Sequence, residues 1–403
     1  MRIVLTTCGS RGDVQPMLAL SLALKSAGHD ILFAGPPEKA AWAARLQCPY
    51  RPLGRNVTAF IDGMENAHSL HAAGRFLSFL RRELVEQFEV LPGIISGADM
   101  VVGSSLVLSL SSVAESMGIA YRYIAFTPQL LPSGFHPAPV FRNQGRPRWV
   151  NRITWRAVRA LDRCNLTLLT NRERRKLGLS HVGDAWSHAL GREVIVASDR
   201  VIGRVPPDAE PSFRQTGYMH LEQPQIDLPA LDTFIEAGPP PVYVGFGSMP
   251  KKDQARNVPL IVDAARSAGQ RVIIAKFWDE PSGFSDADDV FFIKKFPHLQ
   301  LFPRTAAVVH HGGAGTTASG AISGVPQIII PHVLDQYYWG QKVYEANLGP
   351  RPIARSKLTA ERLAAALREA LTNDRTKKSA KAASDAIKAR DSIAMTVREL
   401  LRH

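Results

Sequence analysis

The segment His310–Thr317, with the sequence His-His-Gly-Gly-Ala-Gly-Thr-Thr, carries the clearest chemical pattern in this chain. An apolar run enters it and a helical pattern leaves it, so it is predicted to be a turn between a strand and a helix. Glycines let backbone amides approach a ligand, and the amides and dipole at a helix N-terminus favour phosphate. The spacing is neither that of a P-loop nor the GxGxxG of dinucleotide-binding proteins. The structural alternative is a glycine turn without a ligand.

A second polar pair, Asp335 and Gln336, follows the apolar run Gln327–Ile330. Ligands of open parallel sheets bind outside the carboxyl ends of the strands, which is where this pair is expected. A carboxylate and an amide together accept and donate hydrogen bonds, as sugar hydroxyls require. The alternative is that Asp335 caps a helix beginning near Gln336.

A third segment, Gly9–Asp13, also lies between an apolar run and a helical pattern. Asp13 could act there as a general base toward a hydroxyl group. It could equally be the N-cap of the following helix, whose dipole would lower its pKa and weaken it as a base. Asp286-Ala-Asp288 has the spacing of a metal-binding pair, but it lies in a polar loop, and we predict no essential metal.

The elements that must position these segments are short apolar runs separated by helical patterns. Predicted strands cover 2–7, 31–34, 101–102, 121–125, 242–246, 272–275, 306–309 and 327–330. Predicted helices cover 17–27, 108–117, 257–268 and much of the chain after 359. Strands that alternate with helices indicate a parallel sheet. We therefore predict an α/β protein with two doubly wound, Rossmann-like domains that face a central cleft.

The length of 403 residues fits this division into two domains. We predict an N-terminal domain at 1–205, a proline-rich linker at 206–240 and a C-terminal domain at 241–380. A helical tail at 381–403 is expected to pack back on the N-terminal domain. Hydrophobic content of 45% and charged content of 21% exclude a disordered, collagen-like or coiled-coil chain.

Cys8, Cys48 and Cys164 lie far apart, so neither a disulfide framework nor a zinc site is indicated. No apolar run reaches the roughly 18 residues of a spanning helix, and no signal peptide is recognised. The chain is expected to be cytoplasmic.

The net charge of +13 favours an anionic partner, and most of it comes from residues 142–176, where eleven Arg and Lys residues face two acidic ones. Arg152, Arg156, Arg159 and Arg163 have the spacing of one helix face. We expect apolar residues on the opposite face, namely Val150, Ala157, Val158, Leu161, Cys164 and Leu168. Such a helix is typical of peripheral contact with an anionic membrane, although a solvated arginine face over the core is the alternative.

Taken together, Gly9–Pro16, Pro297-His298, His310–Thr317 and Asp335-Gln336 resemble the nucleotide-sugar glycosyltransferases of the GT-B fold. The similarity is to the UDP-glycosyltransferase superfamily, and within it to the bacterial branch that glycosylates sterols and antibiotics such as glycopeptides and macrolides. The resemblance covers nearly the whole chain and is weakest at about 50–230, where the family varies with its acceptor. It implies an acceptor-binding N-terminal domain and a donor-binding C-terminal domain.

The resemblance also implies roles for single residues. Asp13 matches the base that activates the acceptor hydroxyl, His311 contacts the donor diphosphate, and Asp335 with Gln336 grips the sugar. The expected donor-binding residues are Ser10, Arg11, Gly12, Ser248, Pro297, His298, His311, Gly312, Gly313, Gly315, Thr316, Asp335 and Gln336. Relatives often continue the Pro-His pair with Asp-Trp, whereas this chain continues with Leu299-Gln300, which leaves both uridine and thymidine donors open.

The implied reaction is an inverting transfer of a hexose from a UDP- or dTDP-sugar to a hydroxyl of a hydrophobic acceptor, without metal or other cofactor. His68, His71 and Phe76, in the variable region, are candidates for the acceptor pocket; Phe79 and Phe88 fit a helix core better. The alternatives are a nucleotide-sugar epimerase on the same fold, or a lipid- or nucleic-acid-binding protein. The latter would leave the histidine–glycine segment without a purpose.

Overall fold

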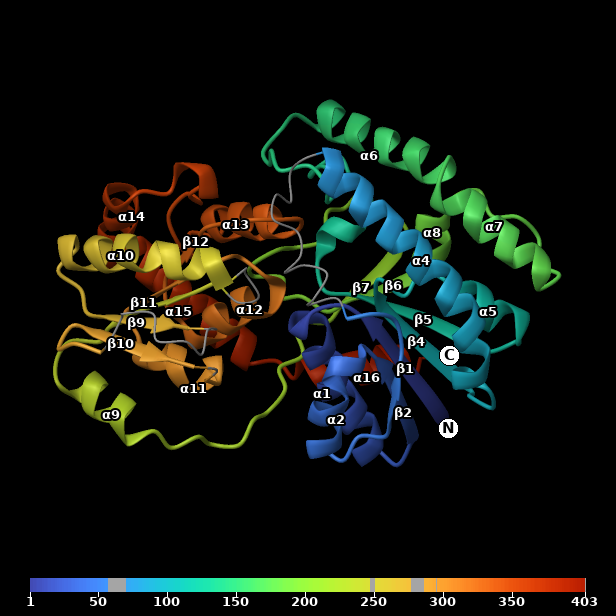
Figure 1. The fold of residues 1–403 in the computed structure, drawn as a ribbon, viewed down its shortest axis with the longest axis horizontal. Coiled ribbons are helices and arrows are strands. Elements are labelled where there is room, and N and C mark those ends of the chain that lie inside the picture. Colours follow the sequence, from blue (N-terminus) through green and yellow to red (C-terminus); the bar gives the residue numbers. More distant parts are fainter. Residues whose placement is uncertain (57–69, 247–250, 277–285, 295, 403) are drawn as a thin grey trace.

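A computed structural model describes residues 1–56, 70–246, 251–276, 286–294 and 296–402 of the chain. It consists of two α/β domains that lie side by side, each built on its own parallel sheet (Figure 1). This architecture confirms the predicted fold class. The connecting chain passes between the domains, and one helix near the C-terminus returns to the first domain.

The first domain contains a seven-stranded sheet in the order β3-β2-β1-β4-β5-β6-β7, with every pairing parallel. The strands are β1 (Arg2–Cys8), β2 (Asp30–Gly35), β3 (Tyr50–Pro52), β4 (Met100–Ser105), β5 (Ala120–Ala125), β6 (Glu193–Val196) and β7 (Ser212–Gln215). The strand order reverses direction between β1 and β4. In doubly wound sheets, the crevice at such a switch point is where ligands bind.

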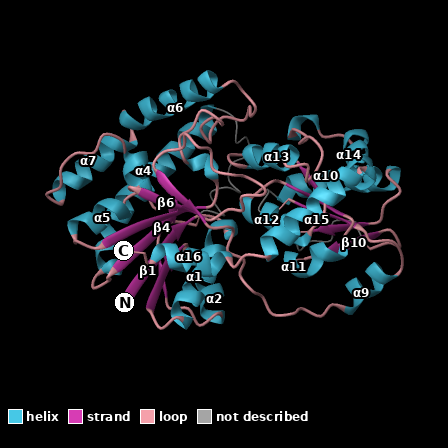
Figure 2. Ribbon diagram, turned by 180° about the vertical axis from the view of Figure 1, so that it is seen from behind, coloured by secondary structure: helices cyan, strands magenta, loops and turns pink. Residues whose placement is uncertain are grey.

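Helices cover both faces of this sheet (Figure 2). They are α1 (Arg11–Ser26), α2 (Ala40–Arg45), α4 (Leu70–Ile95), α5 (Leu110–Ser116), α6 (Arg148–Arg163), α7 (Leu166–Lys176) and α8 (Ala185–Leu190). Successive residues of a strand point to opposite faces. Accordingly, Ile3 and Leu5 of β1 pack in the core under α1, whereas Val4 and Cys8 pack in the core under α4.

The second domain contains a five-stranded parallel sheet in the order β10-β9-β8-β11-β12. Its strands are β8 (Val242–Gly245), β9 (Val272–Ala275), β10 (Val290–Ile293), β11 (Ala307–His310) and β12 (Gln327–Ile329). Its helices are α9 (Pro229–Glu236), α10 (Lys251–Ser267), α11 (His298–Leu301), α12 (Ala314–Ser323), α13 (Gln336–Glu345), α14 (Ala360–Thr372) and α15 (Asp374–Lys388). The switch point lies between β8 and β11, so the histidine–glycine segment follows a strand at the switch.

The chain between the sheets differs from the predicted linker at 206–240. Its first part forms β7, which is a strand of the first sheet, and its last part forms α9, whose Leu231 and Phe234 pack in the second domain's core. Proline-rich sequence hid both elements, because β7 is only four residues long and α9 begins at a proline. The connecting segment proper therefore runs over 216–228.

The last helix, α16 (Ser392–Leu400), packs on the first domain. Leu400 is fully buried among residues of β1 and α1, and Thr396 donates a hydrogen bond to Thr216 over 2.8 Å. The helix before it, α15, instead packs against α12 of the second domain. The return to the first domain thus begins with α16, later than the expected start at 381.

Helix α6 buries a side that was not predicted from the sequence. Its buried side is mostly polar and consists of Asn151, Thr154, Trp155 and Asp162. Leu161, Cys164 and Leu168, which were expected on the face opposite the arginines, are exposed. The reason is that Asp162 accepts hydrogen bonds from Thr167 and from the backbone of α8 at Ala185, which fixes the polar side inward.

Candidate active site

The two switch points face each other across the domain boundary. Tyr218, in the connecting segment, donates a hydrogen bond from its hydroxyl to the Gly12 carbonyl over 3.4 Å. A Cβ atom on Gly315 would lie 2.6 Å from that same hydroxyl oxygen, so the glycine is what allows Tyr218 to approach α12. The Tyr218 hydroxyl therefore lies next to the N-terminal ends of both α1 and α12.

Asp13 lies in the first turn of α1 and is held by the N-cap residue of that helix and by the end of β4. Its Oδ2 accepts hydrogen bonds from the Ser10 N–H at 2.7 Å and the Ser10 hydroxyl at 3.0 Å. Its Oδ1 accepts one from the Ser105 hydroxyl at 2.5 Å. Burial raises the pKa of Asp13, and the hydrogen bonds from Ser105 and Ser10 oppose that rise. The carboxylate is thus fixed in place, with a proton affinity above that of a free aspartate.

Asp13 does take part in capping α1, although it is not the N-cap residue. Ser10, not Asp13, is the N-cap of α1, and Asp13 completes a capping box with it. Gly9 permits this arrangement, because a Cβ atom there would lie 2.3 Å from Asp13 Oδ2. The charge of this carboxylate also raises the pKa of Asp335 in the second domain, so Asp13 lies near the domain boundary.

The remaining residues of the first segment take different roles. The Ser10 hydroxyl is engaged within the loop, since it also accepts the Gly12 N–H at 3.2 Å. The Arg11 guanidinium lies over the Trp42 ring, 5.3 Å from its centroid. Its positive charge also contributes to the low pKa of His298 in the second domain, so Arg11 reaches across the boundary.

The two histidines of the second segment are not equivalent. His310 is fully buried, with Nε2 2.9 Å from the side-chain amide of Gln327 and Nδ1 accepting the Gly312 N–H at 3.1 Å. Its role is to hold the loop. His311 has a buried Nδ1 without a hydrogen-bond partner among the described residues, and burial lowers its pKa to about 4. It is therefore neutral at physiological pH and can donate one hydrogen bond to a ligand.

Helix α12 begins directly after these histidines and is not capped by a side chain. Its N-cap is Gly313, its first turn contains no acidic residue, and its first helical bond is from the Thr317 N–H to the Gly313 carbonyl. The backbone amides before Thr317 therefore lack intrahelical acceptors. Thr316 lies in the same turn and is only partly buried. This end of the helix suits a phosphate group.

Asp335 and Gln336 lie at the start of α13, close to Asp13. Burial, and to a smaller extent the charge of Asp13, raise the pKa of Asp335 to about 7. Asp335 occupies the N-cap position but makes no side-chain capping bond, so capping does not explain the residue. Gln336 Oε1 accepts the backbone N–H groups of His332 at 2.8 Å and Val333 at 3.0 Å, which fixes the loop before the helix.

Pro297 and His298 open the short helix α11 beside the same boundary. The His298 ring stacks on Phe302, with centroids 4.4 Å apart, and lies edge-on to Tyr243. Burial lowers its pKa to about 3. Gln300 donates to the Pro224 carbonyl at 2.8 Å and so ties α11 to the connecting segment. A cavity of about 580 Å³ opens next to it, lined in part by Leu299, Gln300 and Ile226.

Some predicted residues cannot be placed in this site. Ser248, His68 and the side chain of His71 lie outside the described part of the structure. Phe76 is half-buried on α4, whose N-terminal end lies toward the second domain (Figure 1). Phe79 and Phe88 are buried. Asp286 and Asp288 are exposed, and Asp286 accepts the Phe292 N–H at 2.7 Å.

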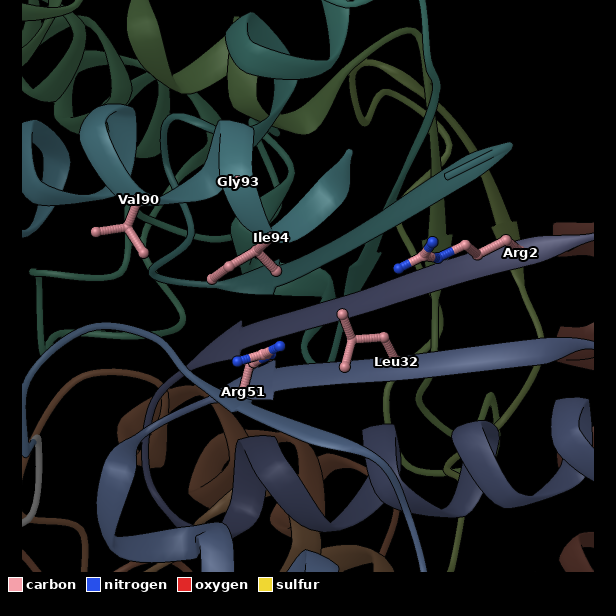
Figure 3. A pocket seen from close by; sticks show the side chains of 6 residues that line it. All are labelled: Arg2, Leu32, Arg51, Val90, Gly93 and Ile94. Carbon is pink, nitrogen blue, oxygen red and sulfur yellow. The ribbon is translucent and has the colours of Figure 1, made fainter. Parts of the chain in front are cut away.

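A second cavity, of about 320 Å³, lies away from the domain boundary, between α4 and the first sheet. The residues that line it are Arg2, Leu32, Arg51, Val90, Gly93 and Ile94 (Figure 3). Arg2 begins β1, whereas Asp13 follows the end of that strand. This cavity is not part of the site.

Two site residues were missed in the sequence, Ser105 and Tyr218. Ser105 ends β4 as the register partner of Cys8, so it faces the turn that carries Asp13. The strand order, once known, would have pointed to it by the switch-point rule. Tyr218 lies in irregular chain, where Asp199 Oδ1 accepts its backbone N–H at 3.3 Å, and the sequence carries no signal for that contact.

Comparisons with known proteins agree with this geometry. Residues 3–133 match the family model of the glycosyltransferase family 28 N-terminal domain. Residues 262–400 match that of the erythromycin biosynthesis protein CIII-like C-terminal domain. The chain is 35% identical to the vancomycin aglycone glucosyltransferase of Amycolatopsis orientalis, over 92% of this chain and 90% of that protein.

Two further similarities extend the comparison. The chain is 30% identical to sterol 3-beta-glucosyltransferase UGT80B1 of Arabidopsis thaliana, over 91% of this chain and 62% of that protein. The crystal structure of the glycosyltransferase VinC in complex with dTDP has a TM-score of 0.70 and 20% identity, covering 100% of this chain and 99% of that one. The similarity to VinC is a similarity of fold.

Proposed function

This chain belongs to the nucleotide-sugar glycosyltransferases of the GT-B fold, in the antibiotic and sterol branch, and from that premise we propose that it is an inverting enzyme whose base is Asp13. The proposed reaction moves a hexose from a UDP- or dTDP-sugar to a hydroxyl of a hydrophobic acceptor. The observation that carries it is the opposition of Asp13 to the uncapped N-terminus of α12 across the domain boundary.

In the proposed mechanism, Asp13 removes the proton of the acceptor hydroxyl while the oxygen of that hydroxyl attacks the anomeric carbon of the donor. Burial makes Asp13 a stronger base than a free aspartate, and Ser10 and Ser105 hold both of its oxygens. The carbon–oxygen bond to the diphosphate breaks on the opposite face. Attack and departure on opposite faces invert the anomeric centre.

The diphosphate gains negative charge as it leaves, and the second domain is built to stabilise it. The amides at the start of α12 and the neutral His311 ring supply hydrogen bonds, aided by the helix dipole. Gly312 and Gly313 lie directly before α12, and Gly315 and Thr316 lie in its first turn. We propose that this donor set takes the place of a metal ion.

Asp335 and Gln336 are proposed to bind the sugar hydroxyls. With a pKa of about 7, Asp335 exists in both protonation states near neutral pH. Since Gln336 Oε1 already accepts two backbone hydrogen bonds, the Nε2 amino group of Gln336 is proposed to donate to a sugar hydroxyl. Pro297 and His298 are proposed to hold the nucleobase, with Arg11 and Ser248 near the phosphates.

The acceptor is proposed to be a hydrophobic natural product or sterol, because the named relatives act on a vancomycin aglycone and on sterols. The epimerase alternative is not supported, since the matching families and relatives are glycosyltransferases. We also propose a cytoplasmic location with peripheral contact to anionic membranes through the arginines of α6. The test of the reaction is a panel of UDP- and dTDP-hexoses against sterol, lipid, macrolide and phenolic acceptors. Mass spectrometry should find one glycosylated product, and isomerised donor in the absence of acceptor would contradict the proposal.

A further inference from the structure

Helix α6 and the start of α7 form the outermost layer of the first domain, over α4 (Figure 1). Large apolar side chains point outward from this layer. Trp149 is 67% exposed, Ile153 50%, Leu161 59% and Leu168 64%. Isolated exposed apolar residues are normal, but four on one helical layer need an explanation.

Arginines run beside this apolar row. With about 100° between successive residues of a helix, Arg148, Arg152, Arg156 and Arg163 fall in one sector of the exposed side. Trp149, Ile153 and Leu161 fall in the adjoining sector. All four arginines are exposed, whereas Arg159, predicted to join them, is only half exposed. We call these four arginines and four apolar residues the basic-apolar face.

The outward direction of the apolar row is fixed by the hydrogen bonds beneath it. The Thr154 hydroxyl accepts the Ala138 N–H at 3.0 Å, and the Asn151 side-chain amide donates to the Gly134 carbonyl at 2.9 Å. The Trp155 Nε1–H donates to the His136 carbonyl at 3.2 Å. Rotating the helix to bury the apolar row would break these bonds and expose Asp162. The basic-apolar face is thus a specified feature of the fold.

We propose that the basic-apolar face docks on an anionic lipid bilayer. An interfacial helix buries its apolar side at the boundary between headgroups and acyl chains, and its cations pair with lipid phosphates. Both requirements are met side by side here, with tryptophan, isoleucine and leucine next to four guanidinium groups. A polyanion such as RNA would use the arginines but would leave the aliphatic row in water.

The basic-apolar face also continues toward the active site, which links it to the proposed function. The Arg148 guanidinium lies over the Phe135 ring at 3.9 Å, and the next exposed residues include Val140 and Phe141. From there, Arg142 lies over Tyr337, the neighbour of Gln336, at 6.0 Å. Given the proposed transferase activity, the docked enzyme would take its hydrophobic acceptor from the bilayer.

The test is co-sedimentation of the full chain with phosphatidylcholine vesicles that do or do not contain phosphatidylserine. The wild type should bind only the anionic vesicles, and added salt should weaken binding. The variant R152Q/R156Q/R163Q should bind about a hundredfold more weakly. The variant W149S/L161S/L168S should also bind at least about tenfold more weakly.

A matched control neutralises three exposed lysines of α15 in K377Q/K378Q/K381Q, where no large apolar side chain is exposed. Equal loss in this control would show a net-charge effect and overturn the proposal. Full binding by the serine variant, or tighter binding to RNA than to vesicles, would overturn it as well. Binding of UDP and dTDP, measured by calorimetry, should be unchanged in all three variants. Loss of nucleotide binding in the wild type would instead count against the proposed function.

Discussion

The helices α1 and α12 each follow a strand at the switch point of their sheet, α1 after β1 and α12 after β11, yet their N-termini are capped in opposite ways. Helix α1 carries its own anion, because Ser10 caps it and Asp13 returns a carboxylate to the cap. Helix α12 has a glycine cap and no acidic residue in its first turn. One helix end is satisfied within the chain and the other is left to a ligand. The proposed function rests on this difference, with a base in the first domain and an anion site in the second.

Removing the carboxylate of α1 should have the largest effect on catalysis. The D13N variant keeps an oxygen that can accept the Ser10 N–H, so α1 should keep its start while the base is lost. Turnover should fall about 10²- to 10⁴-fold, with calorimetric affinity for UDP or dTDP unchanged. D13A should also lose at least about tenfold. Full activity in D13A would refute the assignment of the base.

Removing the imidazole of His311, beside α12, should have the next largest effect. H311A removes a hydrogen bond that strengthens as the diphosphate gains charge, so turnover should fall about ten- to a hundredfold. Affinity for the nucleoside diphosphate should fall as well. Chelation by EDTA should leave wild-type turnover unchanged, and a loss restored by Mg²⁺ would contradict a metal-independent reaction.

A carboxylate introduced into the first turn of α12 would give that helix the arrangement of α1. Thr316 is the third residue of α12, the position that Asp13 holds in α1. T316D should lower affinity for UDP or dTDP at least about tenfold, because a carboxylate repels the phosphates and satisfies the helix end. The neutral T316N variant is the control. Equal losses in both variants would show that the hydroxyl, and not the charge, is what matters.

A smaller effect is expected where Ser105 supports Asp13. The Ser105 hydrogen bond lowers the pKa of Asp13, so its removal in S105A should raise that pKa. Since the base acts deprotonated, the acidic limb of the kcat/KM profile should move to higher pH. Turnover at alkaline pH should change by only a few fold. A limb that stays in place would mean that a group other than Asp13 titrates there.

The smallest effect concerns the stability of α1. S10A removes the N-cap, which typically costs about 1 kcal/mol of the free energy of unfolding. Urea unfolding monitored by circular dichroism measures it. The corresponding G313A change in α12 is not a control for this loss, because a Cβ atom there would lie 2.5 Å from His311 Nε2 and because alanine is a poorer N-cap than glycine. A larger loss than about 2 kcal/mol in S10A would indicate that Asp13 left its position as well.

The local elements of this fold could be predicted from the sequence, whereas its long-range contacts could not. The apolar runs that became β8, β9 and β11 were visible because buried parallel strands are apolar throughout. The segments Gly9–Asp13 and His310–Thr317 were visible because glycines mark a turn at a helix start. Ser105 and Tyr218 were not, since their partners lie 92 and 206 residues away in the chain. The polar buried side of α6 could not be predicted from the sequence, because hydrophobicity alone gives no weight to the buried hydrogen bonds of Asp162.

The contact between α16 and α1 bears on how the protein is made. The core around β1 includes Leu400, with Ile393 and Val397 packed against it, so that core is incomplete until α16 has been synthesised. While the second domain leaves the ribosome, the first domain exposes an apolar site on α1 that only α16 fills. Helix α16 therefore packs on the first domain only after the strands and helices of the second domain have been synthesised. Nascent chains that stop before Ser392 should be the preferred substrates of chaperones that bind exposed apolar surface.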